Sequence, residues 1–278
     1  MNNNQSMAEI ATQTCPIEVR HVSIAFGEKH ALTDVSFQLG CGETLMLLGA
    51  TGSGKSVLLK LIAGLLKPDS GEIIIEGQNI VPLRESELYP IRRRMGIVFQ
   101  EGAIFDSLSV YENIAFPLRE SGETSEDKIE QLVRLVLSFV EMEDAIEKMP
   151  AALSGGMRRR VAVARAIVAQ PSVMLYDSPT AGLDPITAHT INVLIAKLRD
   201  LQHVSSIVVT QRLPDALFLS SFTFSPETRR LTPVKSNGHP EGASSTRFVL
   251  LKDGVVYFAG GREELVSAKD SYVINFIS

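Results

Sequence analysis

Residues 49–56 of this chain read GATGSGKS, and no other stretch of the sequence constrains its function so tightly. The pattern is G-x-x-x-x-G-K-[ST], in which glycines allow consecutive backbone N–H groups to turn toward a polyphosphate. Lys55 supplies a positive charge for the β- and γ-phosphate oxygens, and Ser56 offers a hydroxyl to Mg²⁺. The phosphate-binding residues that this pattern predicts are Gly49, Ala50, Thr51, Gly52, Ser53, Gly54, Lys55 and Ser56.

The residues on both sides of this loop support the same interpretation. Thr44–Leu48 is a short apolar run that predicts a strand, and Val57–Leu66 has apolar residues at helical spacing. A bound phosphate would then lie at a helix N-terminus, where the helix dipole favours anions. We therefore expect the chain to bind a nucleoside triphosphate.

The composition of the chain excludes several other classes of protein. Its 278 residues are 45% hydrophobic, which is enough for one sizeable core or two small ones. The net charge of −5 and the pI near 5.6 argue against a nucleic-acid partner, because nucleic-acid-binding surfaces are basic. The basic runs 92–94 and 158–160 are typical of solvated faces. No apolar run approaches the length of a membrane span, so we expect a cytoplasmic protein.

Strands that alternate with helices predict an α/β fold with a mainly parallel sheet. The apolar runs that predict strands are Thr44–Leu48, Ile73–Glu76, Met95–Phe99, Val173–Tyr176 and Ser206–Val209. Ile17–Phe26 and Ala31–Leu39 alternate apolar and polar residues, as half-buried antiparallel strands do. An Asp-Gly turn at 253–254 predicts a hairpin between Arg247–Leu251 and Val255–Ala259.

A mainly helical stretch interrupts this pattern over about 101–168, and we expect an inserted helical subdomain there. Ser109 and Glu112 form a capping box, and Ser125–Val140 carries a helical apolar stripe. The polar segment 1–16 predicts a disordered tail, so the folded domain is expected to cover 17–278. Residues 225–246 are rich in Ser, Thr, Pro and Gly, and they predict a long loop.

A second motif narrows the class of nucleotide-binding protein. Leu-Ser-Gly-Gly-Met at 153–157 is followed by a predicted helix through Ala169 and by an apolar strand that ends in Asp177. In order and spacing these motifs resemble the ATP-binding cassette (ABC) family over nearly the whole chain from about residue 17. The resemblance implies a P-loop NTPase cassette with a mainly parallel sheet, an antiparallel β subdomain and an inserted helical subdomain.

The resemblance also implies roles for individual residues. Phe26 corresponds to the aromatic residue that stacks on adenine, and Gln100 to the glutamine that reaches Mg²⁺ and senses the γ-phosphate. Asp177 corresponds to the acid that positions Mg²⁺ through water, so the expected metal-binding residues are Ser56, Gln100 and Asp177. The signature residues that contact ATP on the opposite cassette are Ser154, Gly155 and Gly156. Asp184 belongs to the loop that meets its counterpart across the dimer, so the family resemblance implies a second cassette.

Two positions depart from the family pattern at the catalytic centre. The residue after Asp177 is usually Glu, which orients or activates the attacking water, but here it is Ser178. The usual histidine after the Ser206–Val209 strand is replaced by Gln211. Serine has no carboxylate, and the loss of a positioned base costs a factor of roughly 10² to 10⁴ in rate. We expect ATP and Mg²⁺ to bind while the hydrolysis of ATP to ADP and phosphate slows sharply.

The segment after Gln100 points to a branch of the family. It reads EGAIFDSLSVYENIAFPLRE, which resembles the ATPases of phospholipid-trafficking (Mla-like) transporters, as does the run LSGGMRRRVAVARAI. The resemblance implies an ATP-binding subunit that couples ATP binding to transport by a separate integral membrane permease. The chain would then lie peripherally on the inner face of the cell membrane.

Two alternatives stay open at this point. Ser178 and Gln211 also fit a hydrolysis-deficient regulatory or scaffold cassette that uses ATP-driven dimerisation. The chain could equally be the weak-site partner of a second, competent cassette, which leaves homodimer and heterodimer open. The transported substrate and the direction of transport do not follow from the sequence.

Overall fold

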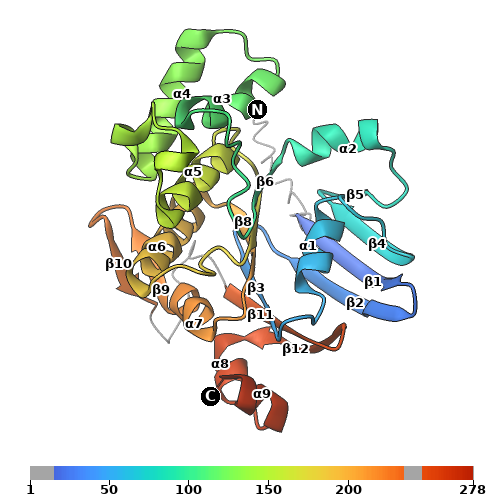
Figure 1. Ribbon diagram of the computed structural model, residues 1–278. Coiled ribbons are helices and arrows are strands. Elements are labelled where there is room, and N and C mark those ends of the chain that lie inside the picture. Colours follow the sequence, from blue (N-terminus) through green and yellow to red (C-terminus); the bar gives the residue numbers. More distant parts are fainter. Residues whose placement is uncertain (1–15, 235–245, 278) are drawn as a thin grey trace, which may run out of the picture.

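The strand before the glycine-rich loop lies inside a six-stranded sheet with the order β12-β11-β3-β8-β7-β6 (Figure 1). The structure is a computed structural model, and it describes residues 16–234 and 246–277. Five strands of this sheet run parallel, and β12 is antiparallel to β11. The strands are β3 (Thr44–Gly49), β6 (Met95–Val98), β7 (Val173–Asp177), β8 (Ser205–Val209), β11 (Thr246–Lys252) and β12 (Val255–Gly261). The predicted mainly parallel sheet is confirmed.

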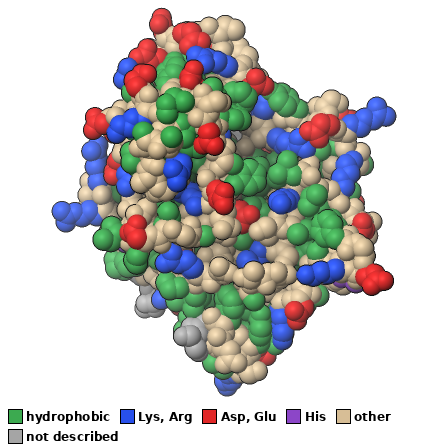
Figure 2. Space-filling model, viewed as in Figure 1, with side chains coloured by type: hydrophobic (Ala, Val, Ile, Leu, Met, Phe, Trp, Pro, Cys, Tyr) green, Lys and Arg blue, Asp and Glu red, His purple; other side chains and the backbone are tan. Residues whose placement is uncertain are grey.

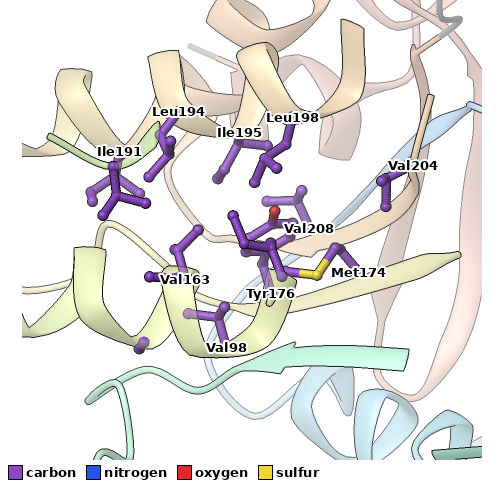
Figure 3. Packing of buried hydrophobic residues seen from close by; sticks show 14 of the residues in the cluster. Val98, Val163, Met174, Tyr176, Ile191, Leu194, Ile195, Leu198, Val204 and Val208 are labelled. Atoms are coloured by element: carbon purple, nitrogen blue, oxygen red, sulfur yellow. The ribbon is translucent and has the colours of Figure 1, made fainter. Parts of the chain in front are cut away.

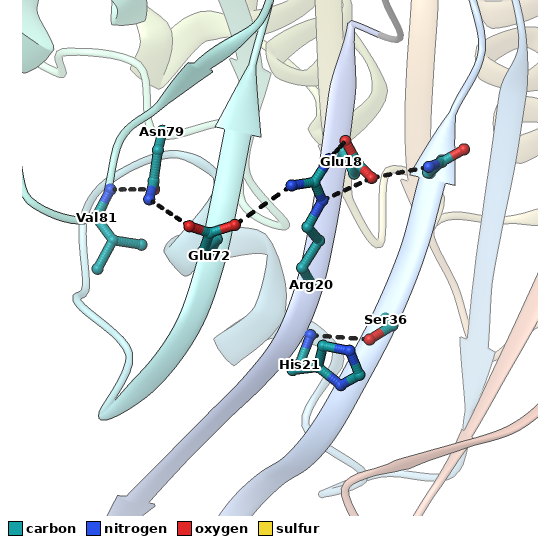
Figure 4. Close-up of polar contacts among 8 residues, drawn as sticks. Glu18, Arg20, His21, Ser36, Glu72, Asn79 and Val81 are labelled. Carbon is teal, nitrogen blue, oxygen red and sulfur yellow. Dashed lines mark hydrogen bonds and ion pairs between the residues drawn. The ribbon is translucent and has the colours of Figure 1, made fainter.

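A second sheet has four antiparallel strands in the order β2-β1-β4-β5. These strands are β1 (Ile17–Phe26), β2 (Lys29–Leu39), β4 (Ser70–Ile75) and β5 (Gln78–Asn79). The buried side chains of β1 pack inward, while Arg20 on its exposed side pairs with Glu18 and Glu72 at 2.8 and 3.4 Å (Figure 4). One apolar and one polar face are what the sequence alternation predicts.

The helices lie on both faces of the parallel sheet and at its ends (Figure 1). They are α1 (Lys55–Ile62), α2 (Glu85–Arg92), α3 (Val110–Glu120), α4 (Glu126–Phe139), α5 (Gly155–Ile167), α6 (Pro185–Gln202), α7 (Leu213–Ser221), α8 (Arg262–Val266) and α9 (Ser271–Ile277), with short 3₁₀ turns at Glu143–Ala145 and Pro150–Ala152. Helices α3, α4 and α5 all fall within 101–168. That this stretch is a separate subdomain stays a prediction.

Two apolar cores form because successive side chains of a strand point to opposite faces. Met46 and Leu48 join the core under α3–α7, whereas Leu45 and Leu47 join the core under α1 and the antiparallel sheet. Tyr176 lies fully buried in the first core, facing the α6 side chains (Figure 3). Among the described residues its hydroxyl has no hydrogen-bond partner, and burial raises the pKa of Tyr176.

The expectation of a continuous loop over 225–246 is wrong for its first part. Strands β9 (Phe222–Ser225) and β10 (Arg230–Pro233) form a two-stranded sheet there. Each strand has only four residues, too few for its alternation to be recognised in the sequence. The backbone N–H of Phe224 donates to Asp200 of α6, which holds β9 against that helix. Residues 235–245 and the predicted tail before Pro16 lie outside the described residues.

Candidate functional site

The predicted site residues follow strands that end at one edge of the parallel sheet. The glycine-rich loop follows β3, Gln100 follows β6, Asp177 ends β7, and Gln211 follows β8. Parallel strands bring their carboxyl ends to the same edge, where α/β proteins bind their ligands. The fold therefore gathers at this edge motifs that are up to about 160 residues apart, as the contact between Thr51 and Gln211 shows.

The phosphate loop has a backbone that requires glycine at Gly54. This residue adopts φ 99°, and a Cβ there would lie 2.6 Å from the carbonyl oxygen of Ala31. Lys55 is buried at the start of α1, and its Nζ donates to the carbonyls of Gly49 and Ala50 at 2.8 Å each. Burial lowers the pKa of Lys55, and the nearby Asp177 carboxylate opposes that shift. A polyphosphate at this loop would add negative charge beside the buried ammonium.

Oxygen ligands converge at the end of β7. The Ser56 hydroxyl donates to Asp177 Oδ1 at 3.2 Å, and the Ser178 hydroxyl donates to the same oxygen at 3.4 Å. Ser178 adopts φ 50°, a left-handed conformation that is uncommon outside glycine and recurs at functional sites. Hydroxyl and carboxylate oxygens are the ligands that Mg²⁺ prefers. The described residues hold no group of three or more His, Cys, Asp or Glu side chains that could bind a metal ion.

Gln211 lies directly beside the phosphate loop. Its Oε1 accepts a hydrogen bond of 2.8 Å from the Thr51 hydroxyl. The amide NH₂ is the donor with which this side chain would bind an anion. Gln100 is exposed just beyond β6, and the preceding carbonyl, of Phe99, accepts a 2.9 Å bond from Arg159.

Phe26 borders a cavity of about 290 Å³ next to the phosphate loop. The cavity also contacts Ala31, Gly54, Ser56 and Val57, so an object seated in it touches both the aromatic ring and the loop. Phe26 is 53% exposed, so a ligand in the cavity can reach it. A flat aromatic base stacks favourably on such a ring.

The signature residues and Asp184 form a second cluster. Ser154 caps α5 by accepting the N–H of Met157 at 3.3 Å, and Asp184 caps α6 by accepting the N–H groups of Ile186 and Thr187. Bonds from Thr187 hold the pKa of Asp184 below its usual value. A Cβ on Gly156 would lie 2.3 Å from Thr187 Cγ2, so the first turns of α5 and α6 are in contact. The starts of both helices are exposed.

Sequence reasoning missed several buried polar residues that connect these loops. Arg159 is only 5% exposed, and its guanidinium donates to the carbonyls of Phe99 and Ala181. The interpretation of 158–160 as a solvated face is therefore wrong at this residue, because the loops after β6 and β7 offer carbonyls that only a buried donor can reach. Asp215 and Thr180 are also buried and bonded to each other. No local motif in the sequence marks them.

Comparisons with known proteins agree on one family. The family model described as ABC transporter matches residues 32–181. The intermembrane phospholipid transport system ATP-binding protein MlaF of Haemophilus influenzae is 34% identical, over 94% of this chain and 89% of that protein. The probable ribonucleotide transport ATP-binding protein mkl of Mycobacterium leprae is 35% identical, over 90% and 79% of the two chains.

Solved structures give the same result at the level of the fold. A dimeric ATP-binding cassette in a post-hydrolysis state, bound to ADP and Pi, has a TM-score of 0.74 and 30% identity over 88% of this chain and 98% of its own. The cbiO1 protein of Clostridium perfringens, part of an ABC transporter complex, has a TM-score of 0.75 and 26% identity, covering 92% of each chain. Within the described part of the chain, no helix is long and apolar enough to cross a membrane.

Proposed function

The chain belongs to the ABC transporter family, and from that membership we propose that it is the ATP-binding subunit of a transporter whose membrane-spanning part is a separate chain. The observation that carries the proposal is the convergence of the phosphate loop, Asp177 and Gln211 at one sheet edge. We propose phospholipid as the cargo, because the relative with 34% identity over 94% of this chain is named for phospholipid transport.

The residues at the sheet edge have separate tasks in the proposed site. The N–H groups of the phosphate loop and the Lys55 ammonium would hold the β- and γ-phosphates at the N-terminus of α1. Ser56 and Asp177, already within 3.2 Å of each other, would hold Mg²⁺ together with Gln100. Mg²⁺ held by these residues would offset the negative charge that develops on the phosphate oxygens. Phe26 would stack on the adenine ring.

Hydrolysis at this site is proposed to be slow. Ser178 can hydrogen-bond a water, but it cannot accept the proton of that water near neutral pH. Gln211 can hold a phosphate oxygen or a water through its amide, so positioning of the γ-phosphate is retained. Ser154–Gly156 and Asp184 would meet ATP and the corresponding loop of a second cassette. A second, competent cassette would supply the hydrolysis that a weak site in this chain lacks.

A groove of about 870 Å³ between α2, α3 and α5 is the proposed contact with the membrane partner. Phe116 of α3 is 40% exposed on it, and its ring lies 4.9 Å from that of Phe105. Arg165 of α5 also lines the groove and stacks on Phe105. In Figure 2, which has the view of Figure 1, hydrophobic side chains lie between the part at the top that carries α3 and α4 and the part that carries α2. An amphipathic helix fits a groove with exposed aromatics and a cation.

The test is co-purification from membranes of the organism that encodes the chain. The unaltered protein is expected to retain a polytopic membrane protein in detergent, and Phe116→Asp is expected to lose it. Val266→Asp is the matched control, since Val266 on α8 is 57% exposed and lies outside the groove. Both variants should bind ATP as the unaltered chain does. Retention of soluble partners alone would contradict the proposed transporter role.

A further inference from the structure

A buried carboxylate lies next to the segment that carries Gln211. Asp215, in the first turn of α7, is 6% exposed. Its Oδ2 accepts a 2.5 Å bond from the Thr180 hydroxyl, its Oδ1 accepts a 2.8 Å bond from Asn192, and the Arg212 Nε lies 3.5 Å away. A buried charge needs such partners, and losing one of them disturbs the others.

The partners of Asp215 come from three different elements. Thr180 belongs to the segment after β7 that begins with Ser178, Asn192 to the middle of α6, and Arg212 directly follows Gln211. Arg212 also donates from Nη1 to the carbonyl of Thr180 at 3.3 Å. The segment after β7 and the segment after β8 are thus cross-linked through the side chains of Thr180, Arg212 and Asp215.

The backbone on the other side of Gln211 is held as well. The N–H of Thr210 donates to the carbonyl of Leu47, and the Thr210 hydroxyl accepts the N–H of Arg212 at 2.9 Å. Gln211 therefore sits between two fixed residues, with its side chain on Thr51. Loosening the bonds to Asp215 would release one of the two supports.

We propose that Asp215 and Thr180 are positioning residues that hold Gln211 at the γ-phosphate. The proposal rests on the nucleotide-binding function proposed above. Neither side chain touches the nucleotide, and both act through the direction in which the Gln211 amide points. Only a ligand with a γ-phosphate should therefore sense their removal.

The test compares a non-hydrolysable ATP analogue with ADP, each with Mg²⁺, on three variants. Thr180→Val keeps the shape of the side chain and removes its hydroxyl, and Thr180→Ser keeps the hydroxyl. Thr180→Val is expected to weaken binding of the ATP analogue about tenfold and to leave ADP binding within about twofold, the effect of one hydrogen bond to a charged group. Thr180→Ser should bind both nucleotides normally, as should the control Thr190→Val on α6, whose hydroxyl donates to its own helix.

A double-mutant cycle separates positioning from a structural role. Gln211→Ala should cause the same loss as Thr180→Val, and the two together should lose no more than either alone. Additive losses, an equal loss for both nucleotides, or no loss would overturn the proposal. If Thr180→Val does not fold, Arg212→Gln is used, because the Arg212 side chain is 37% exposed. An unaltered chain that binds neither nucleotide would instead overturn the proposed nucleotide-binding function.

Discussion

Lys55 is the residue whose charge responds most directly to a bound phosphate. Its ammonium is buried against backbone carbonyls, and burial lowers its pKa below the ordinary value of 10.5. A polyphosphate favours the charged form and raises the pKa again, so binding takes up a proton at pH values between the two pKa values. The affinity for the polyphosphate should be constant at pH values below the pKa that Lys55 has in the free protein. It should fall as the pH rises through that pKa.

The measurement is ADP affinity without added metal, by calorimetry from neutral pH to about pH 10, with buffers of different ionisation enthalpy that report proton uptake. Lys55→Arg is the control, because arginine stays charged over this range. At neutral pH, the arginine variant should bind ADP no more tightly than the unaltered chain does. Its affinity for ADP should not fall as the pH rises, whereas that of the unaltered chain should. The same slope for both proteins would show that Lys55 is not the titrating group.

At this scale, the sequence predicts residues that belong to local motifs. The phosphate loop, Asp177 and Gln211 are close together in the structure, as their positions after strands imply. Arg159, Thr180 and Asp215 could not be predicted, because their partners are carbonyls and side chains on other elements. Their roles follow from tertiary contacts that no pattern of neighbouring residues encodes. Whether the motif residues act as proposed stays a prediction until the tests above are made.

The starts of α5 and α6 approach closely at Gly156, which has no side chain. Gly156 lies so close to Thr187 that an added Cβ would be 2.3 Å from its Cγ2. Gly156→Ala is therefore expected to push the two helix starts apart and to lower the free energy of unfolding by about 1 to 3 kcal/mol. Urea unfolding followed by circular dichroism measures this change, which suits a chain without tryptophan.

A second substitution tests the cause of that destabilisation. Thr187→Ser removes Cγ2 and keeps the hydroxyl that bonds Asp184. In the Gly156→Ala background it should restore at least half of the lost stability, and in the unaltered chain it should have little effect. If Thr187→Ser restores nothing, the close contact at Gly156 is not what makes glycine necessary there.

Whole elements were predictable where a pattern is long or where a cap marks an end. The capping box at Ser109 opens α3, as the sequence predicts, and Asp184 with Pro185 opens α6. Helix α2 was missed because Pro90 lies inside it, and α7 because its apolar spacing covers only nine residues. Short elements such as β9 and β10 depend on contacts with α6 rather than on their own composition.

The whole molecule combines the expected phosphate loop with Ser178 and Gln211 at the two positions where the family pattern has glutamate and histidine. The two apolar cores fix the parallel sheet, and the sheet edge brings together the phosphate loop, Asp177 and Gln211. The sheet type and the order of elements could be predicted from apolar periodicity. The groove between α2, α3 and α5 could not, because it depends on how separate elements pack. We propose that this arrangement binds ATP firmly and hydrolyses it slowly.

The most direct test is single-turnover hydrolysis, with protein in excess over Mg-ATP. It compares the unaltered chain with the Ser178→Glu, Gln211→His double variant. Both proteins should bind ATP with similar affinity, since the phosphate loop and Asp177 are unchanged. The double variant should hydrolyse ATP roughly 10² to 10⁴ times faster, the contribution of a positioned general base. Equal rates in the two proteins, with equal ATP binding, would contradict the claim and would mean that another residue of the chain serves as the base.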